Sequence, residues 1–134
     1  MQRPAATAGL RHVALYVRDL AAAEHFYVDL LGMEVEWRPD PDNVYLSSGC
    51  DNLALHRAAA DFDPDCSQRL DHIGFILRSE DEVDRWHDFL AANGVTIKAA
   101  PRTHRDGARS FYCADPEGVI VQMIYHPPIA GACG

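Results

Sequence analysis

The sequence predicts an α+β fold in which one domain is built from two similar βαβββ modules. Three observations lead to this prediction. The chain has 134 residues, which suits one hydrophobic core. A segment that begins at Arg11 can be laid over a segment that begins at Asp71. Each copy has the pattern of a strand, a helix and three further strands. We therefore expect a domain at residues 10–126, with module one at 11–57, a linker at 58–70, module two at 71–125 and a tail at 127–134.

The first strand of each module alternates between two faces. Val13, Leu15 and Val17 share one face of the first strand, whereas the opposite face begins with His12. The second module repeats this pattern from His72. Because alternate strand residues point to opposite sides of a sheet, the aliphatic face should pack against a helix and the histidine face should stay open.

A helix is predicted after each of these strands. Asp19 is a suitable N-cap for the first helix, and Ser79 with Glu82 forms a capping-box pattern for the second. Gly32 and Gly94 suit the left-handed position that ends many helices. The remaining strands are predicted, in order, at residues 33–37, 44–47, 53–57, 95–99, 109–114 and 119–125.

The composition argues against several classes of partner. Twenty acidic and 12 basic residues give a formal charge of −8, which disfavours binding to nucleic acid or to an anionic membrane surface. No apolar run approaches the roughly 18 residues of a membrane span. We expect a cytoplasmic protein with no nucleic-acid partner and no membrane, whose four isolated cysteines are reduced.

Four polar side chains are candidates for one metal site. The overlay pairs His12 with His72, and it pairs His56 with Gln122 because each follows the end of a turn by four residues. Strand alternation places all four on the open faces. Imidazole nitrogens and an amide oxygen are suitable ligands for a divalent transition metal. A single histidine of this kind would more often be a hydrogen-bonded cavity residue, so it is the set that points to a metal.

The motifs resemble those of the vicinal oxygen chelate superfamily, which includes glyoxalase I, extradiol dioxygenases and bleomycin resistance proteins. The resemblance covers about residues 10–126 and rests on RHVALYVRDL, AEHFYVDLLGMEV, LDHIGFIL and RSFYCADPEGVIVQMIYH. It implies a cupped mixed sheet made by two βαβββ modules, a homodimer, and a divalent metal at the positions of His12, His56, His72 and Gln122. The metal identity stays open among Fe, Ni, Zn and Mn.

The predicted ligand set departs from the family pattern. Metal-dependent members commonly carry glutamate at one or both of the positions assigned here to His56 and Gln122, where it can transfer a proton. The sequence therefore assigns no catalytic base. A neutral set of ligands would favour an anionic substrate oxygen.

Basic residues concentrate from the end of the second predicted strand of module two to the start of the third. This segment contains Arg102, His104, Arg105 and Arg109 in an otherwise acidic chain, and arginine can bind a carboxylate through two hydrogen bonds. We predict that these four residues contact the substrate. A solvated hairpin loop is the alternative explanation.

Two functions are compatible with these sequence features. The first is a metal-dependent enzyme of the glyoxalase or extradiol dioxygenase type that acts on a small oxygen-rich molecule. The alternative is a metal-free small-molecule binding protein of the bleomycin-resistance type. The metal content of the native protein distinguishes them.

Overall fold

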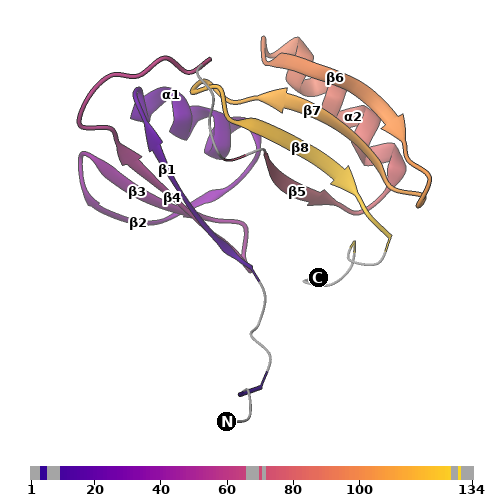
Figure 1. The fold of residues 1–134 in the computed structure, drawn as a ribbon, viewed down its shortest axis with the longest axis horizontal. Helices are drawn as coiled ribbons and strands as arrows, with labels where there is room; N and C mark the ends of the chain where they lie inside the picture. The colour runs from indigo at the N-terminus through magenta and orange to yellow at the C-terminus, as the bar shows by residue number, and fades with distance from the viewer. Residues whose placement is uncertain (1–3, 6–9, 66–69, 71, 128–129, 131–134) are drawn as a thin grey trace.

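The chain folds into two βαβββ modules that lie side by side (Figure 1). A computed structural model describes residues 4–5, 10–65, 70, 72–127 and 130. Module 1 consists of β1 (His12–Val17), α1 (Leu20–Glu24), the π-helix η1 (His25–Leu30), β2 (Glu34–Asp40), β3 (Asn43–Ser47) and β4 (Asn52–Arg57). Module 2 consists of β5 (Ile73–Leu77), α2 (Glu80–Ala92), β6 (Thr96–Thr103), β7 (Arg109–Ala114) and β8 (Ile120–Tyr125).

Each module forms its own four-stranded mixed sheet. The strand order is β1-β4-β3-β2 in the first sheet and β5-β8-β7-β6 in the second. In both sheets the first strand of the module runs parallel to the last, and the other pairs are antiparallel. The predicted α+β class and duplicated plan are confirmed.

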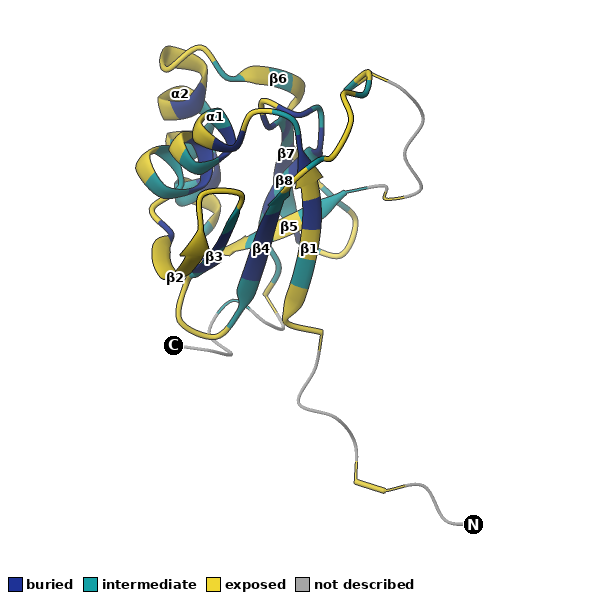
Figure 2. Ribbon diagram, turned by 90° about the vertical axis from the view of Figure 1, so that its left-hand side faces the viewer, coloured by how far each residue is buried: buried dark blue, intermediate teal, exposed yellow. Residues whose placement is uncertain are grey.

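The helices cover one side of the sheets, as the aliphatic strand faces required. Figure 2 shows α1 and α2 together on that side, with the strands and their buried residues beside them. Asp19 accepts a hydrogen bond from the Ala22 backbone N–H at 3.0 Å, and Ser79 accepts one from Glu82 at 3.2 Å, so both predicted caps are present. The wide π turn of η1 was not predicted, and it turns the adjacent Phe26 and Tyr27 both into the core.

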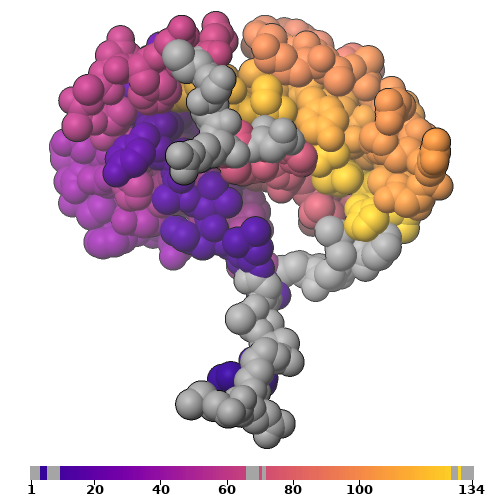
Figure 3. Space-filling model, viewed as in Figure 1, coloured from indigo at the N-terminus to yellow at the C-terminus, as the bar shows by residue number. Residues whose placement is uncertain are grey.

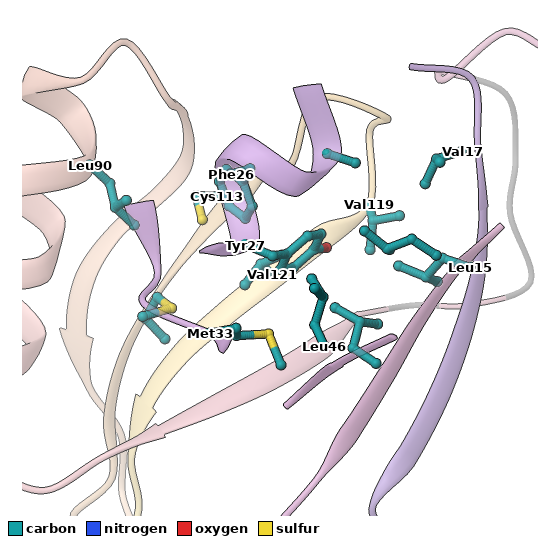
Figure 4. Packing of buried hydrophobic residues seen from close by; sticks show 14 of the residues in the cluster. Leu15, Val17, Phe26, Tyr27, Met33, Leu46, Leu90, Cys113, Val119 and Val121 are labelled. Atoms are coloured by element: carbon teal, nitrogen blue, oxygen red, sulfur yellow. The ribbon is translucent and has the colours of Figure 1, made fainter. Parts of the chain in front are cut away.

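The two modules share one hydrophobic core. Leu15, Val17 and Leu46 from module 1 lie in the same buried cluster as Val119 and Val121 from module 2 (Figure 4). Burial of these side chains is the main force that holds the modules together.

Two acidic residues of the β7–β8 turn add polar contacts between the modules. The modules form the two lobes seen in Figure 3. The buried Glu117 carboxylate accepts hydrogen bonds from the Arg18 and Asp19 backbone N–H groups and from Arg18 Nε. The hydroxyl of buried Tyr27 donates a hydrogen bond to Asp115 Oδ2 at 2.8 Å. The turn of module 2 therefore anchors the start of α1 and the middle of η1.

The cysteines differ from the expectation in part. Cys113 is a free, buried thiol, and burial raises its pKa to about 12. Cys50, however, is disulfide-bonded, so the expectation that it is reduced was wrong. Cys66 and Cys133 lie outside the described residues. Within the described residues, no helix has the length and apolar character needed to cross a membrane.

Candidate functional site

Three of the predicted metal ligands, His12, His56 and Gln122, lie on strand faces turned away from the shared core, which we call the open faces, and His72 directly precedes β5. In β1, Leu15 and Val17 are buried, whereas His12 and Tyr16 are exposed. Gln122 in β8 is half-buried between the buried residues Val121 and Met123. The predicted separation of aliphatic and polar faces therefore holds in both sheets.

The pairing register corrects the predicted equivalence of His56 and Gln122. Gln122 pairs with Gly74 and Tyr112, and the residue that pairs with Ala14 and Tyr45 in module 1 is Ala54. Ala54, not His56, is thus the counterpart of Gln122. The counterpart of His56 is Ile124, which pairs with Ile76 and Ser110.

The two residues were wrongly paired because the strands that follow the two turns begin at different positions relative to those turns. Asn52 is already a strand residue that pairs with His12. Gly118 still belongs to its turn, with φ of +84°, and β8 begins two residues later at Ile120. Counting four residues from each turn therefore reaches two different levels of the sheet.

A hydrogen-bond network fixes the imidazole of His12. Asn52 Nδ2 donates to Glu36 Oε2 at 2.9 Å, and Asn52 Oδ1 lies 2.8 Å from His12 Nδ1. Because the carboxylate can only accept, the asparagine oxygen must face the histidine, and His12 Nδ1 must carry the proton. In the neutral form of this ring, Nε2 is therefore the nitrogen that carries the lone pair.

A second network of the same kind fixes His56. Asn43 Nδ2 donates to both carboxylate oxygens of Asp40, at 2.9 and 3.0 Å, and Asn43 Oδ1 lies 2.6 Å from His56 Nδ1. In the neutral form of His56, Nε2 is likewise the acceptor nitrogen. His56 is level with Tyr16, which is four residues from His12, or about 13 Å along the strand. Each ring is fixed by its own asparagine, and the two rings lie at different levels of the sheet. These two histidines are therefore unsuited to bind one ion together.

A third network orients Gln122 in module 2. Arg102 donates to His104 Nδ1 at 3.3 Å, so His104 Nε2 carries the proton that it directs to Ser110 Oγ at 3.0 Å. Gln122 Nε2 donates to the same oxygen at 3.2 Å. The Gln122 Oε1 atom is consequently turned toward Gly74, whose missing side chain leaves that oxygen accessible.

The four residues predicted to contact the substrate are used in different ways. His104 and Arg105 line a cavity of about 430 Å³ together with Gln122. Arg102 supports His104, as described above. Arg109 instead binds Asp84 of α2 at 2.7 and 3.2 Å, and this hydrogen bonding lowers the pKa of Asp84. The guanidinium of Arg109 is therefore committed to a structural contact.

The remaining candidate, His72, packs edge-on against Tyr112 at 5.6 Å between ring centres. Within the part of the chain that the structure describes, no three His, Cys, Asp or Glu side chains form a group able to hold a metal. One chain by itself does not bring the three predicted histidines together. Four supporting residues were not predicted. Asn52, Asn43 and Ser110 each lie in a strand beside that of a predicted ligand, whereas Glu36 lies on β2, two strands from Asn52.

Comparisons with known proteins agree with this architecture. The family model described as Glyoxalase/Bleomycin resistance protein/Dioxygenase superfamily matches residues 9–123. The metallothiol transferase FosB of Staphylococcus haemolyticus is 26% identical over 116 residues, which cover 86% of this chain and 81% of FosB. An uncharacterized protein of Bacillus subtilis, YqjT, is 26% identical over 125 residues, covering 86% and 97% of the two chains.

Solved structures show the same fold. The lactoylglutathione lyase of Agrobacterium tumefaciens superposes with a TM-score of 0.73 at 26% identity, over 89% of this chain and 94% of that one. A glyoxalase/bleomycin resistance protein/dioxygenase from Alicyclobacillus acidocaldarius gives a TM-score of 0.70 at 24% identity, over 90% and 92%. With its duplicated modules and matching family model, the chain belongs to the glyoxalase/bleomycin resistance protein/dioxygenase superfamily.

Proposed function

We propose that this protein is a metal-dependent enzyme that acts on a small oxygen-rich molecule, with a divalent transition metal held by His12, His72 and Gln122. The observation that supports this most is the orientation of two donor atoms by separate networks. The Glu36–Asn52 pair leaves His12 Nε2 as an acceptor, and the Ser110 hydroxyl leaves Gln122 Oε1 free. Ligating histidines commonly donate their other ring N–H to such an outer partner.

The register decides which predicted ligands the proposal retains. His72 precedes β5, and Gln122 is level with Gly74 beside it, so both belong to one end of the module 2 sheet. His12 occupies the corresponding place in module 1. His56 is left out because it lies two residues beyond Ala54, which is the counterpart of Gln122. Ala54 itself has no side-chain atom that could bind a metal.

The proposal includes a homodimer as the unit that completes the site. The two sheets of one chain do not pair with each other, and among its described residues no three His, Cys, Asp or Glu side chains form a group able to hold a metal. A second copy would allow the open face of module 1 to meet the open face of module 2. The isologous contact of a two-fold dimer would generate two such sites.

The neutral character of the donor set restricts the substrate. When bound, a divalent ion would act as a Lewis acid toward a substrate oxygen. Two imidazoles and an amide contribute no negative charge, so a substrate with an enolate, catecholate or phosphonate oxygen is favoured. The names of two relatives, a metallothiol transferase and a lactoylglutathione lyase, are consistent with small-molecule chemistry of this type.

Metal stoichiometry in paired histidine variants tests the proposal. His12→Ala should lower the content of transition metal after reconstitution to below about a tenth of an equivalent, because it removes a ligand. His56→Ala is the matched control, since it removes the same group from the same face of the same sheet, and it should keep the wild-type content. Equal losses in both variants would contradict the ligand set derived from the register.

A metal-free binding protein is the second candidate. It is supported by the observation that no three His, Cys, Asp or Glu side chains of the described residues form a group able to hold a metal. Native protein that contains less than about a tenth of an equivalent of any transition metal, even after reconstitution, would select this function.

A further inference from the structure

A cavity lies between the helical segments of the two modules, on the side of the molecule opposite the open faces. It has a volume of about 330 Å³, and its lining consists of Leu30 from η1 and Glu82, Arg85, Trp86 and Phe89 from α2. Figure 2 shows α1 and α2 on this side of the sheets. We call it the interhelical cavity. The proposed homodimer joins the open faces, so it leaves the interhelical cavity uncovered.

Apolar side chains form most of the cavity wall. Leu30 and Trp86 pack against the hydrophobic core, which fixes the floor of the cavity. Trp86 and Phe89 meet edge-on, with 5.7 Å between ring centres and 87° between ring planes. Phe89 is 44% exposed, so its ring is accessible from solvent. Because small-molecule sites begin at about 300 Å³, this cavity suits a ligand with a single ring.

One carboxylate in the cavity is held in place with an oxygen to spare. Glu82 Oε2 accepts a hydrogen bond from the Arg78 backbone N–H at 2.7 Å, whereas Glu82 Oε1 accepts none from the described residues. The other charged group of the lining is already compensated, since Arg85 Nε lies 3.1 Å from Asp81 Oδ2. The cavity therefore offers a fixed carboxylate oxygen together with two aromatic rings.

The charge of α2 favours a positive ligand. The helix carries five acidic residues and one arginine, in a chain with a formal charge of −8. Asp84 is bound to Arg109, but no basic side chain of the described ranges forms an ion pair with Glu80 or Glu82. The helix dipole accounts for acidic residues in the first turn. The aromatic pair beyond that turn adds ring faces that attract a cation.

We propose that the interhelical cavity is a metal-independent binding site for a small organic ammonium ion that carries one aromatic ring. The ammonium group donates to Glu82 Oε1, and the ring packs against Trp86 and Phe89. The site goes beyond the proposed function, because it needs neither a metal nor a second copy of the chain. The proposed metal ligands His12 and Gln122 belong to the open faces, on the other side of the sheets.

Benzylammonium and benzyl alcohol provide a matched pair of probes. They share a ring and a methylene group, but only benzylammonium is charged at neutral pH. Each is titrated into chelator-treated, full-length protein at about pH 7. The indole N–H signal of Trp86 in a proton–nitrogen correlation spectrum reports binding, and that of Trp37 on β2 reports nonspecific association.

The expected result is a saturable shift of the Trp86 signal, with a midpoint about fivefold lower for benzylammonium than for benzyl alcohol. An exposed ion pair together with a cation–π contact provides a preference of this size. Sodium chloride at about 1 M should reduce the preference below about twofold, because salt screens the ion pair. His12→Ala should leave the preference unchanged, which separates this site from the proposed metal function.

Glu82→Gln tests the carboxylate while keeping the start of the helix intact, since glutamine can also accept from the Arg78 N–H. The preference should fall below about twofold. Asp88→Asn is the matched control, because it removes the same charge from the same helix at a residue that does not line the cavity. This control should keep the fivefold preference.

Phe89→Ala tests the aromatic wall, and it should raise both midpoints about threefold because both probes use the ring. Equal midpoints in the wild type, a Trp86 signal that does not saturate, or a preference that survives Glu82→Gln would overturn the proposal. A Trp86 signal that responds to protein concentration but not to either probe would assign the cavity to a second copy of the chain, and it would also overturn the proposal.

Discussion

Modules 1 and 2 share a backbone plan but hold the starts of their helices in different ways. The start of α2 is held by residues of its own module, since Ser79 accepts from the Glu82 backbone and the Glu82 carboxylate accepts from Arg78 at 2.7 Å. The start of α1 has its own cap in Asp19, but the N–H groups of Arg18 and Asp19 bind Glu117 of module 2. Module 1 is therefore completed by module 2, and the two should unfold together.

The hydrogen-bond networks of the two open faces end at side chains of opposite charge. In module 1 the networks end at the carboxylates of Glu36 and Asp40. In module 2 the network ends at the guanidinium of Arg102. Both arrangements end in an acceptor atom. In module 1 a carboxylate orients an asparagine, which orients a histidine. In module 2 an arginine orients a histidine, and this histidine and a glutamine both donate to one serine.

The largest effect should come from removing the contact between the modules at Glu117. Glu117→Ala removes a buried carboxylate and leaves the Arg18 and Asp19 N–H groups without this acceptor, and it should lower the free energy of unfolding by about 3 kcal/mol. Glu82→Ala removes the analogous carboxylate within module 2 and should cost about 1 kcal/mol. Denaturant unfolding of both variants measures the difference, and equal losses would show that module 1 does not depend on module 2 in this way.

The second contact of the turn predicts a pH dependence. Burial raises the pKa of Asp115, although hydrogen bonds from Tyr27 and from backbone N–H groups act in the opposite direction. A carboxyl group whose folded pKa exceeds its unfolded value contributes stability below the unfolded pKa, near 4, and this contribution is lost as pH rises through the folded pKa.

Asp115→Asn should therefore gain stability relative to wild type as the pH rises from about 4 to 7. The exposed Asp63→Asn is the control and should follow the wild-type profile. Parallel stability profiles for Asp115→Asn and wild type would rule out the effect of burial.

These contacts mark the limit of what the sequence predicts. Strand alternation and the repeat located every strand and both caps, because they depend on local patterns such as Val13, Leu15 and Val17. The level of His56 depends on where a strand begins after its turn, which a residue count cannot determine. The networks through Asn52 and Ser110 join different strands, so they become visible only when the sheet register is known.

A substitution at Gln122 sharpens the comparison of the two sheets at the proposed metal site. Gln122→Glu adds a charged oxygen at nearly constant size, and it should tighten the binding of Ni²⁺ or Zn²⁺ about tenfold. His56→Glu adds the same charge to the open face of module 1 and should change the affinity by less than about twofold. Calorimetric titration of both variants measures this, and unchanged affinity in Gln122→Glu would remove Gln122 from the ligand set.

The smallest expected effect concerns the arginine end of the module 2 network. Arg102→Met removes the donor that keeps His104 Nδ1 unprotonated, so His104 no longer has to direct its Nε2 proton to Ser110. The Gln122 amide, which shares that serine, becomes less restrained. We expect metal affinity to fall about twofold, since the ligand itself remains.

Arg105→Met is the matched control for this prediction. It removes the same charge three residues further along, in the turn between β6 and β7, and among the described residues Arg105 has no hydrogen bond or ion pair. The side-chain amide signals of Gln122 provide a readout that does not depend on metal, and they should shift in Arg102→Met but not in Arg105→Met. If both variants lose affinity equally while the Gln122 signals stay unchanged, Arg102 acts only through its charge, and the network does not orient the amide.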